Sequence, residues 1–127
     1  MEGWVRGLVE AIHSSPTQAV IVLAGGASQA LGWLMSVPGA SNTILEVAVP
    51  YSKISMAQFL SKIPTQFTSQ QTAEEMALVA YNRALKLSRP VLGVGFTGSL
   101  ASTHPKRGDH RYTFPFLFQL FCEVLWI

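Results

Sequence analysis

The sequence predicts an α/β domain built on a largely parallel sheet. Three short apolar segments rich in β-branched residues, at 19–24, 44–49 and 91–96, alternate with segments that have helical patterns. Alternation of this kind places helices against both faces of a parallel sheet. The length of 127 residues allows one domain and leaves little room for a second.

The first predicted unit is a helix, a buried strand and a second helix. A helix is expected over 2–13, because apolar residues recur there at spacings of one, three and four before Ser14 and Pro16 end it. The run 19–24 is continuously apolar, as in strands buried on both faces. Gly25 and Gly26 then turn the chain into a helix over 27–36, which Pro38 and Gly39 stop.

The second half contains two more predicted strands and two more predicted helices. Pro50 ends the strand at 44–49, and a short helix follows at about 53–61. Thr72 and Glu75 are three apart and predict a capping box, so the next helix is expected from 72 to about 88. The strand at 91–96 leads into a loop of small hydroxylated residues at 97–103, and residues 104–111 form an exposed polar loop.

Composition excludes several classes of protein. Charged residues make up 13%, about half the usual share of roughly 25%, and the formal net charge is +2, so neither a disordered acidic tail nor a nucleic-acid-binding arm is expected. The hydrophobic share of 49% and the mean hydropathy of +0.31 leave apolar surface for a partner. The N-terminus lacks the pattern of a secretory signal, which predicts an intracellular and cytoplasmic protein.

Neither a metal site, a cofactor nor a membrane span is expected. Cys122 is the only cysteine, which excludes an intramolecular disulfide and a zinc site of several thiolates. His13, His104 and His110 are too scattered for a metal cluster and are interpreted as surface residues. The longest apolar run, 113–127, would reach about 22 Å as a helix, short of the roughly 30 Å membrane core.

A ligand site is predicted where the carboxyl ends of the strands meet, because ligands of open α/β sheets bind there. Three segments converge at that edge, at 24–28, 50–53 and 95–99. Glycines let a ligand approach the backbone, and exposed amides at helix starts favour an anion. The alternative is a set of ordinary strand-to-helix turns without a ligand.

Three motifs in this order resemble the CinA C-terminal domain family, which includes nicotinamide-nucleotide amidohydrolases. They are Gly32-Trp33-Leu34-Met35-Ser36-Val37-Pro38-Gly39-Ala40-Ser41, Val49-Pro50-Tyr51-Ser52 and Val94-Gly95-Phe96-Thr97-Gly98. The resemblance covers roughly residues 18–108. It implies a three-layer α/β sandwich that often oligomerises. It also implies hydrolysis of the carboxamide of nicotinamide mononucleotide by a Ser nucleophile that a Lys amine activates.

The two reactive positions of that pattern are substituted in this chain. Counting along the motifs places Ala24 at the position of the nucleophilic Ser and Met56 at the position of the Lys. Because loss of either member removes most of such chemistry, the sequence predicts a domain without amidohydrolase activity. The alternative is an active amidohydrolase in which Ser28 is the nucleophile and Lys53 is the base.

The sequence predicts that the domain still binds a pyridine mononucleotide, although amidohydrolase activity is predicted to be lost. The candidate binding residues are Gly25, Gly26, Ser28, Tyr51, Ser52, Thr97, Gly98 and Ser99. Thr97 and Ser99 would donate hydrogen bonds to a phosphate, or would cap their own loop instead. A further alternative is a structural module that forms a homo-oligomer or packs on a partner domain.

The C-terminal residues depart from the pattern. The CinA-like domain is therefore assigned to 1–111 and considered incomplete, with 112–127 as an unrelated apolar tail. A truncated or alternatively spliced product would account for this change, for example a short form of a fusion with a nicotinate-nucleotide adenylyltransferase-like domain. The competing interpretation docks the tail on the sheet as a helix or strand, and Pro115 restricts a strand to the edge.

Overall fold

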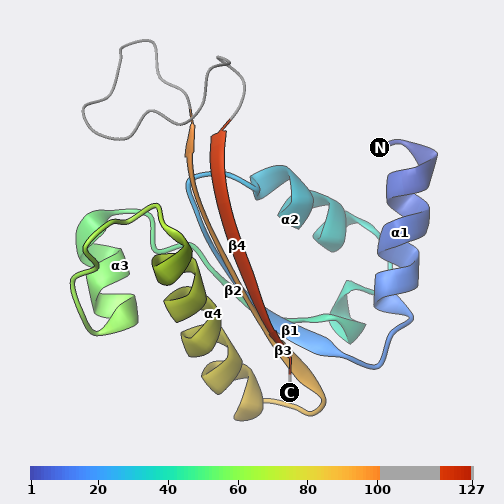
Figure 1. Cartoon of the computed structure of the whole chain (residues 1–127). Helices are drawn as coiled ribbons and strands as arrows, with labels where there is room; N and C mark the ends of the chain where they lie inside the picture. The colour runs from blue at the N-terminus through green and yellow to red at the C-terminus, as the bar shows by residue number, and fades with distance from the viewer. Residues whose placement is uncertain (101–117, 127) are drawn as a thin grey trace.

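The computed structural model describes residues 1–100 and 118–126 and has three layers (Figure 1). Helix α1 (Gly3–His13) and helix α2 (Ser28–Ser36) lie on one side of a four-stranded sheet, and helix α3 (Lys53–Leu60) and helix α4 (Gln70–Leu85) lie on the other. A short 3-10 turn, η1 (Ala40–Asn42), precedes the second strand. The predicted α/β sandwich is confirmed.

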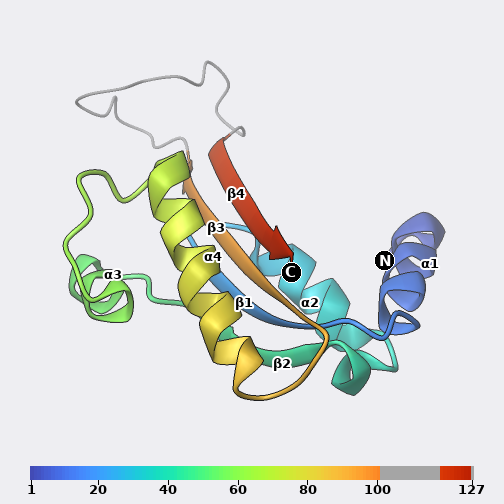
Figure 2. The ribbon, with the colours of Figure 1, turned by 60° about the horizontal axis from the view of Figure 1, so that its bottom comes forward.

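The sheet consists of β1 (Gln18–Ala24), β2 (Ile44–Ala48), β3 (Val91–Leu100) and β4 (Phe118–Trp126), in the order β2-β1-β3-β4. The first three strands are parallel, and β4 pairs antiparallel with β3 at one edge (Figure 2). The largely parallel sheet is thus confirmed. Residues 118–126 of the predicted tail form an edge strand, as the competing interpretation proposed, and Pro115 lies outside the described residues.

Strand β1 is buried on both faces, as predicted. Its even-numbered residues from Val20 to Ala24 belong to the cluster that packs against α3 and α4. Its odd-numbered residues from Ala19 to Leu23 belong to the cluster that packs against α2. The period of two in side-chain direction therefore divides the core into two layers, one on each face of the sheet.

Helix α4 lies unusually close to β3, because two glycines face it. A Cβ atom on Gly93 would lie 2.3 Å from the backbone nitrogen of Tyr81, and one on Gly95 would lie 2.4 Å from the carbonyl oxygen of Ala73. Ala77 and Ala80 of α4 are fully buried at this contact. Helix backbone and strand backbone therefore touch directly, which only glycine on the strand permits.

Three predicted boundaries are wrong. Helix α4 begins at Gln70, because the Ser69 hydroxyl caps it by accepting the Thr72 amide at 3.1 Å, so Thr72 is not the cap. The helix ends at Leu85 rather than at 88, and the Leu87 and Ser88 amides bond back to the Ala84 carbonyl. Strand β3 continues through residues 97–100 instead of forming a loop, because β4 supplies partners up to Leu100.

Candidate functional site

The turn from β1 to α2 lies against the end of β3, where the sequence predicts a ligand site. Gly25 and Gly26 have φ values of +76° and +136°, and Ala27, which precedes the first residue of α2, has φ of 62°. A Cβ atom on Gly25 would lie 1.9 Å from the carbonyl oxygen of Gly98. Gly25 is therefore required for the close approach of two chain segments, in a backbone conformation that glycine favours.

The positions that the resemblance assigns to a Ser and a Lys lie in the same cluster of the apolar core. Ala24 is 8% exposed and Met56 is 2% exposed, and both belong to the cluster between the sheet and helices α3 and α4. Val20, Val22 and Met76 share this cluster. Both positions thus lie in one apolar cluster, where a methyl group and a thioether occupy them, and neither group can take up a proton.

Thr97 is buried at this end of the sheet and has a structural partner. Its side chain is 2% exposed, and its hydroxyl donates to the carbonyl oxygen of Phe67 at 2.8 Å. This bond fixes the segment between α3 and α4 to β3. The prediction that Thr97 stands in a loop is wrong, and its hydroxyl proton is used within the protein. The backbone of Gly98 and Ser99 lies in the same strand.

Ser52 and Tyr51 differ in their surroundings. Ser52 caps α3, because its hydroxyl oxygen accepts the amide of Ser55 at 3.1 Å. Tyr51 is 75% exposed. Lys53, the first residue of α3, is exposed, and its amine lies 5.9 Å from the centre of the Phe67 ring, within range of a cation–π contact. Tyr51 and Lys53 therefore remain accessible at this end of the sheet, whereas the Ser52 oxygen is already engaged.

Ser28 and Lys53 belong to helices on opposite faces of the sheet (Figure 1). Ser28 is exposed at the start of α2. The hydrogen bonds of the described residues include none between its hydroxyl and the Lys53 amine. The structure gives no contact on which a relocated Ser–Lys pair would rest.

His13 forms a buried polar cluster at the other end of the sheet, so its interpretation as a surface residue is wrong. Its side chain is 5% exposed, with Nε2 2.9 Å from the Leu34 carbonyl oxygen and Nδ1 2.7 Å from the Thr43 hydroxyl. Because a carbonyl only accepts, Nε2 donates to Leu34, and in the neutral ring Nδ1 accepts from Thr43. His13 thereby ties α1 to α2 and to the residue before β2.

One sequence signal points to a buried His13. Val5, Val9 and His13 are four residues apart, so His13 continues the buried stripe of α1. A cavity of about 430 Å³ lies beside this stripe, and its lining includes Arg6, Glu10 and Asn42. The side chains of Arg6 and Glu10 pair with each other at 3.0 Å.

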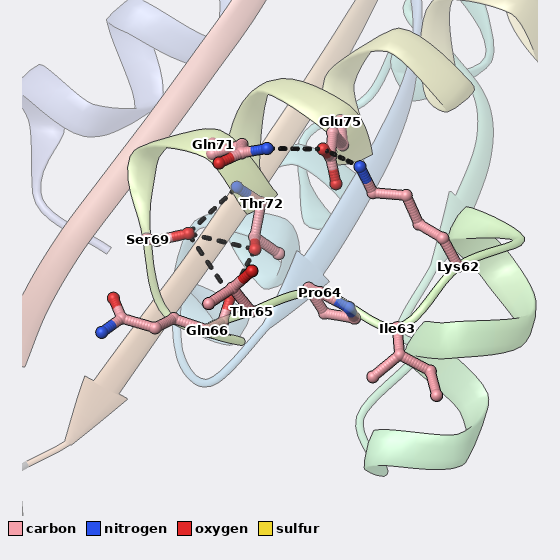
Figure 3. A pocket seen from close by; sticks show the side chains of 9 residues that line it. All are labelled: Lys62, Ile63, Pro64, Thr65, Gln66, Ser69, Gln71, Thr72 and Glu75. Atoms are coloured by element: carbon pink, nitrogen blue, oxygen red, sulfur yellow. Dashed lines mark hydrogen bonds and ion pairs between the residues drawn. The ribbon is translucent and has the colours of Figure 1, made fainter.

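A second hollow, of about 240 Å³, lies between the segment after α3 and the first turns of α4 (Figure 3). Lys62 reaches across it to an ion pair with Glu75, and Gln71 donates to the same carboxylate at 3.3 Å. Thr72 and Ser69 donate to the Gln66 carbonyl. These polar groups satisfy one another, so the hollow offers no uncompensated charge to a ligand.

The described residues form neither a cluster of metal ligands nor a helix that could span a membrane. Residues 1–100 and 118–126 bring together no group of three His, Cys, Asp or Glu side chains that could hold a metal ion. Within the same part of the chain, no helix has the length and apolar character needed to cross a membrane.

Solved structures of CinA-superfamily proteins share this fold. The competence/damage inducible protein CihA from Agrobacterium tumefaciens aligns with a TM-score of 0.59 and 21% identity over 86% of this chain and 67% of that chain. CinA superfamily proteins from Enterobacter cloacae and Escherichia coli also align with TM-scores of 0.59, at 13% and 14% identity, over 97% and 99% of this chain and 76% of each of theirs.

Sequence comparisons add no relative to these structures. No model of a known protein family matches the chain, and no curated protein matches it. The structural likeness therefore shows the fold, and the chain has a CinA C-terminal-like fold.

Proposed function

We propose that this protein is a CinA-like domain that has lost amidohydrolase chemistry and serves pyridine-nucleotide metabolism as a binding or assembly module. The observation that carries this proposal is the burial of Ala24 and Met56 in one apolar cluster. Acyl transfer by a Ser–Lys pair needs an alcohol as the nucleophile and an amine as the base. Neither group is present at the two positions that the resemblance assigns to this pair.

The remaining hydroxyls near the strand ends support the same proposal. Thr97 donates to a backbone carbonyl and is buried, and the oxygen of Ser52 accepts a helix amide. Ser28 is free to solvent, but Lys53 belongs to a helix on the other face of the sheet. A nucleophile needs its base within hydrogen-bond reach, and no described pair at this edge meets that condition.

An assay of ammonia release from nicotinamide mononucleotide tests the loss of chemistry. The purified full chain is compared with its Ser28→Ala and Lys53→Ala variants, and no release above the buffer rate is expected for any of the three. Turnover by the parent chain that disappears in either variant would establish the relocated pair and refute the proposal. Turnover that persists in both variants and still co-purifies with the chain would also refute the proposal, whereas turnover that separates from the chain on further purification comes from a contaminating enzyme.

Binding of a pyridine mononucleotide is the second candidate function, and the accessibility of Tyr51 and Lys53 beside the strand ends favours it. An aromatic ring and a cation would complement a pyridinium base and a phosphate. Calorimetric titration with nicotinamide mononucleotide and with nicotinate mononucleotide tests this candidate. Tyr51→Ala is expected to abolish the heat, whereas Ile63→Ala, which truncates another exposed side chain, is expected to leave it unchanged. If the parent chain showed neither heat of binding nor thermal stabilisation by the mononucleotides, ligand binding would be excluded and only the assembly role would remain.

We also propose a protein context and a cellular location for the domain. A CinA-like domain joined to a nicotinate-nucleotide adenylyltransferase-like domain in the cytoplasm would place a binding or assembly module beside an enzyme of the same metabolism. This chain has no His-x-Gly-His motif of such a transferase, so it would contribute no transferase chemistry itself. Co-purification of the chain with transferase activity from its native source tests the association.

A further inference from the structure

Two aromatic rings on the α3 and α4 side of the sheet have a cation beside them, and the two cations are held differently. The Arg83 guanidinium lies 5.7 Å from the centre of the Phe59 ring, and it also donates to both carboxylate oxygens of Glu46. The Lys53 amine lies 5.9 Å from the centre of the Phe67 ring. Among the residues that the structure describes, no ion pair involves this amine. The cation at Phe59 is therefore fixed by a carboxylate, whereas the cation at Phe67 is not.

Phe67 is anchored at the carboxyl end of the parallel strands, beside the substituted positions. Its backbone carbonyl accepts the hydroxyl of Thr97 at 2.8 Å, and Thr97 is paired with Ala24 in the sheet. Its half-buried ring packs against the apolar cluster that contains Ala24 and Met56. The Lys53 side chain, in contrast, is exposed and has a flexible four-carbon stem. A fixed aromatic ring and a movable amine thus lie together at the edge where a ligand is expected.

We infer that Phe67 binds the positively charged pyridinium ring of a mononucleotide in place of the Lys53 amine, which then pairs with the phosphate of the same ligand. This inference rests on the binding role in the proposed function and names the ring charge as the property that the site recognises. A pyridinium ring is a planar cation, and the face of an aromatic ring attracts it as it attracts an ammonium group. The Phe67 ring therefore keeps a cation beside it, and the amine receives an anionic partner.

The exchange requires both charges on the ligand. An exposed lysine and an aromatic ring attract each other weakly, whereas a hydrogen bond from an ammonium group to a phosphate is strong. A cationic ring without a phosphate would displace the amine and offer it no new partner. A phosphate on an uncharged ring would draw the amine away and leave Phe67 without a cation. The site therefore selects phosphates of N-substituted pyridinium compounds.

Calorimetric titration of the full chain with nicotinamide mononucleotide and with its reduced form tests this selection. The reduced form keeps the ribose, phosphate and carboxamide, but its dihydropyridine ring is uncharged. The parent chain is expected to bind the cationic form about fivefold more tightly, the effect of one moderate cation–π contact. Phe67→Leu is expected to bind both forms equally, and Phe67→Tyr, which keeps an aromatic face, to retain the preference. Phe59→Leu is the matched control and should also retain it, because Glu46 fixes the cation at that ring.

Nicotinamide riboside, which has the cationic ring and no phosphate, tests the exchange of the amine. Lys53→Ala is expected to weaken the binding of nicotinamide mononucleotide about tenfold, because the phosphate loses its partner. The same variant is expected to bind the riboside more tightly than the parent does, because no amine competes for the Phe67 ring. A riboside affinity that Lys53→Ala leaves unchanged or lowers would overturn the exchange.

The outcomes separate this inference from the proposed function. Equal binding of the two mononucleotide forms by the parent, or a preference that Phe67→Leu retains, would overturn the inference and leave mononucleotide binding intact. Absence of binding for both forms would refute the binding role itself and the inference with it. Urea unfolding establishes that each variant is folded, and the measurements on the parent and on Lys53→Ala decide the question even if Phe67→Leu does not fold. None of these titrations measures ammonia release, so the lost chemistry is judged separately.

Discussion

The two faces of the sheet are packed in different ways. On one face α4 rests its alanines on Gly93 and Gly95, so that backbone meets backbone. On the other face the side chains of Ile21 and Phe96 fill the layer beneath α2, and no residue of α2 is fully buried. The α4 face therefore has no room for an added atom, whereas the α2 face can relax. Ala24 and Met56 both belong to the core on the tightly packed α4 face.

Substitution of Gly95 is expected to have the largest effect. In Gly95→Ala the new Cβ atom would meet the Ala73 carbonyl oxygen at 2.4 Å and the Ala77 nitrogen at 2.6 Å, and backbone atoms cannot turn aside. We expect a loss of about 4 kcal/mol of unfolding free energy, at the upper end for overpacking. Urea unfolding measures it.

Gly32→Ala is the matched control on α2. A Cβ atom on Gly32 meets nothing within 4 Å, and alanine favours a helix over glycine by about 1 kcal/mol, so this variant is expected to be slightly more stable than the parent. Equal destabilisation of both variants would show that the two faces do not differ in their packing.

Met56→Lys places an amine at the position where the resemblance expects one. The variant tests whether the closely packed α4 face of the sheet accepts a buried charge. Met56 is 2% exposed among apolar side chains, so the ammonium group would be buried without a partner. We expect a loss of about 3 kcal/mol and no ammonia release from nicotinamide mononucleotide. Lys53→Met, the reverse change at an exposed site, should alter the stability by less than about 0.5 kcal/mol. A stable Met56→Lys variant would mean that the pocket for the family amine survives.

His13→Ala tests the more open face, where polar bonds contribute to holding the helices. The substitution removes bonds to the Leu34 carbonyl and the Thr43 hydroxyl and leaves a buried space beneath α1. We expect a loss of about 2 kcal/mol, because two buried groups lose their partners. Urea unfolding measures this loss, and Gln58→Ala, at an exposed position of α3, serves as the comparison. If the two variants were equally stable, His13 would contribute nothing as a tie between α1, α2 and β2.

The sequence predicts the alternation of strands and helices because those signals are local. The apolar run before Gly25 predicts β1 with both faces buried, and the Pro38–Gly39 pair marks the end of α2. The cap of α4 is missed because Ser69 also has a capping side chain three residues before an available amide, and the Thr72 hydroxyl donates to the Gln66 carbonyl in place of accepting a helix amide. The extension of β3 beyond residue 96 depends on β4, a pairing between segments distant in the chain that local patterns do not reveal.

The sequence predicts which residues stand at the two positions of the candidate site, and the structure adds their packing. The count along the motifs predicts a site without reactive groups at Ala24 and Met56, and this stays a prediction, whereas their burial in one apolar cluster is seen only in the structure. The role of Gly25 is not readable, because glycine in a turn favours a ligand and a close chain contact equally. Only the position of the Gly98 carbonyl, 1.9 Å from a Cβ on Gly25, identifies the chain contact.

Thr97→Val is expected to have the smallest effect on the free energy of unfolding. It separates the contribution of a hydrogen bond from that of packing on the α4 face of the sheet. Valine keeps the shape of threonine but leaves the Phe67 carbonyl without the donor that now lies 2.8 Å away. A loss of about 1 kcal/mol is expected from urea unfolding, with faster hydrogen exchange between residues 62 and 69 as that segment loosens from β3. Thr65→Val is the control at an exposed threonine of the same segment. If Thr97→Val unfolded like the parent while weakening the binding of a mononucleotide, its hydroxyl would serve a ligand rather than the fold.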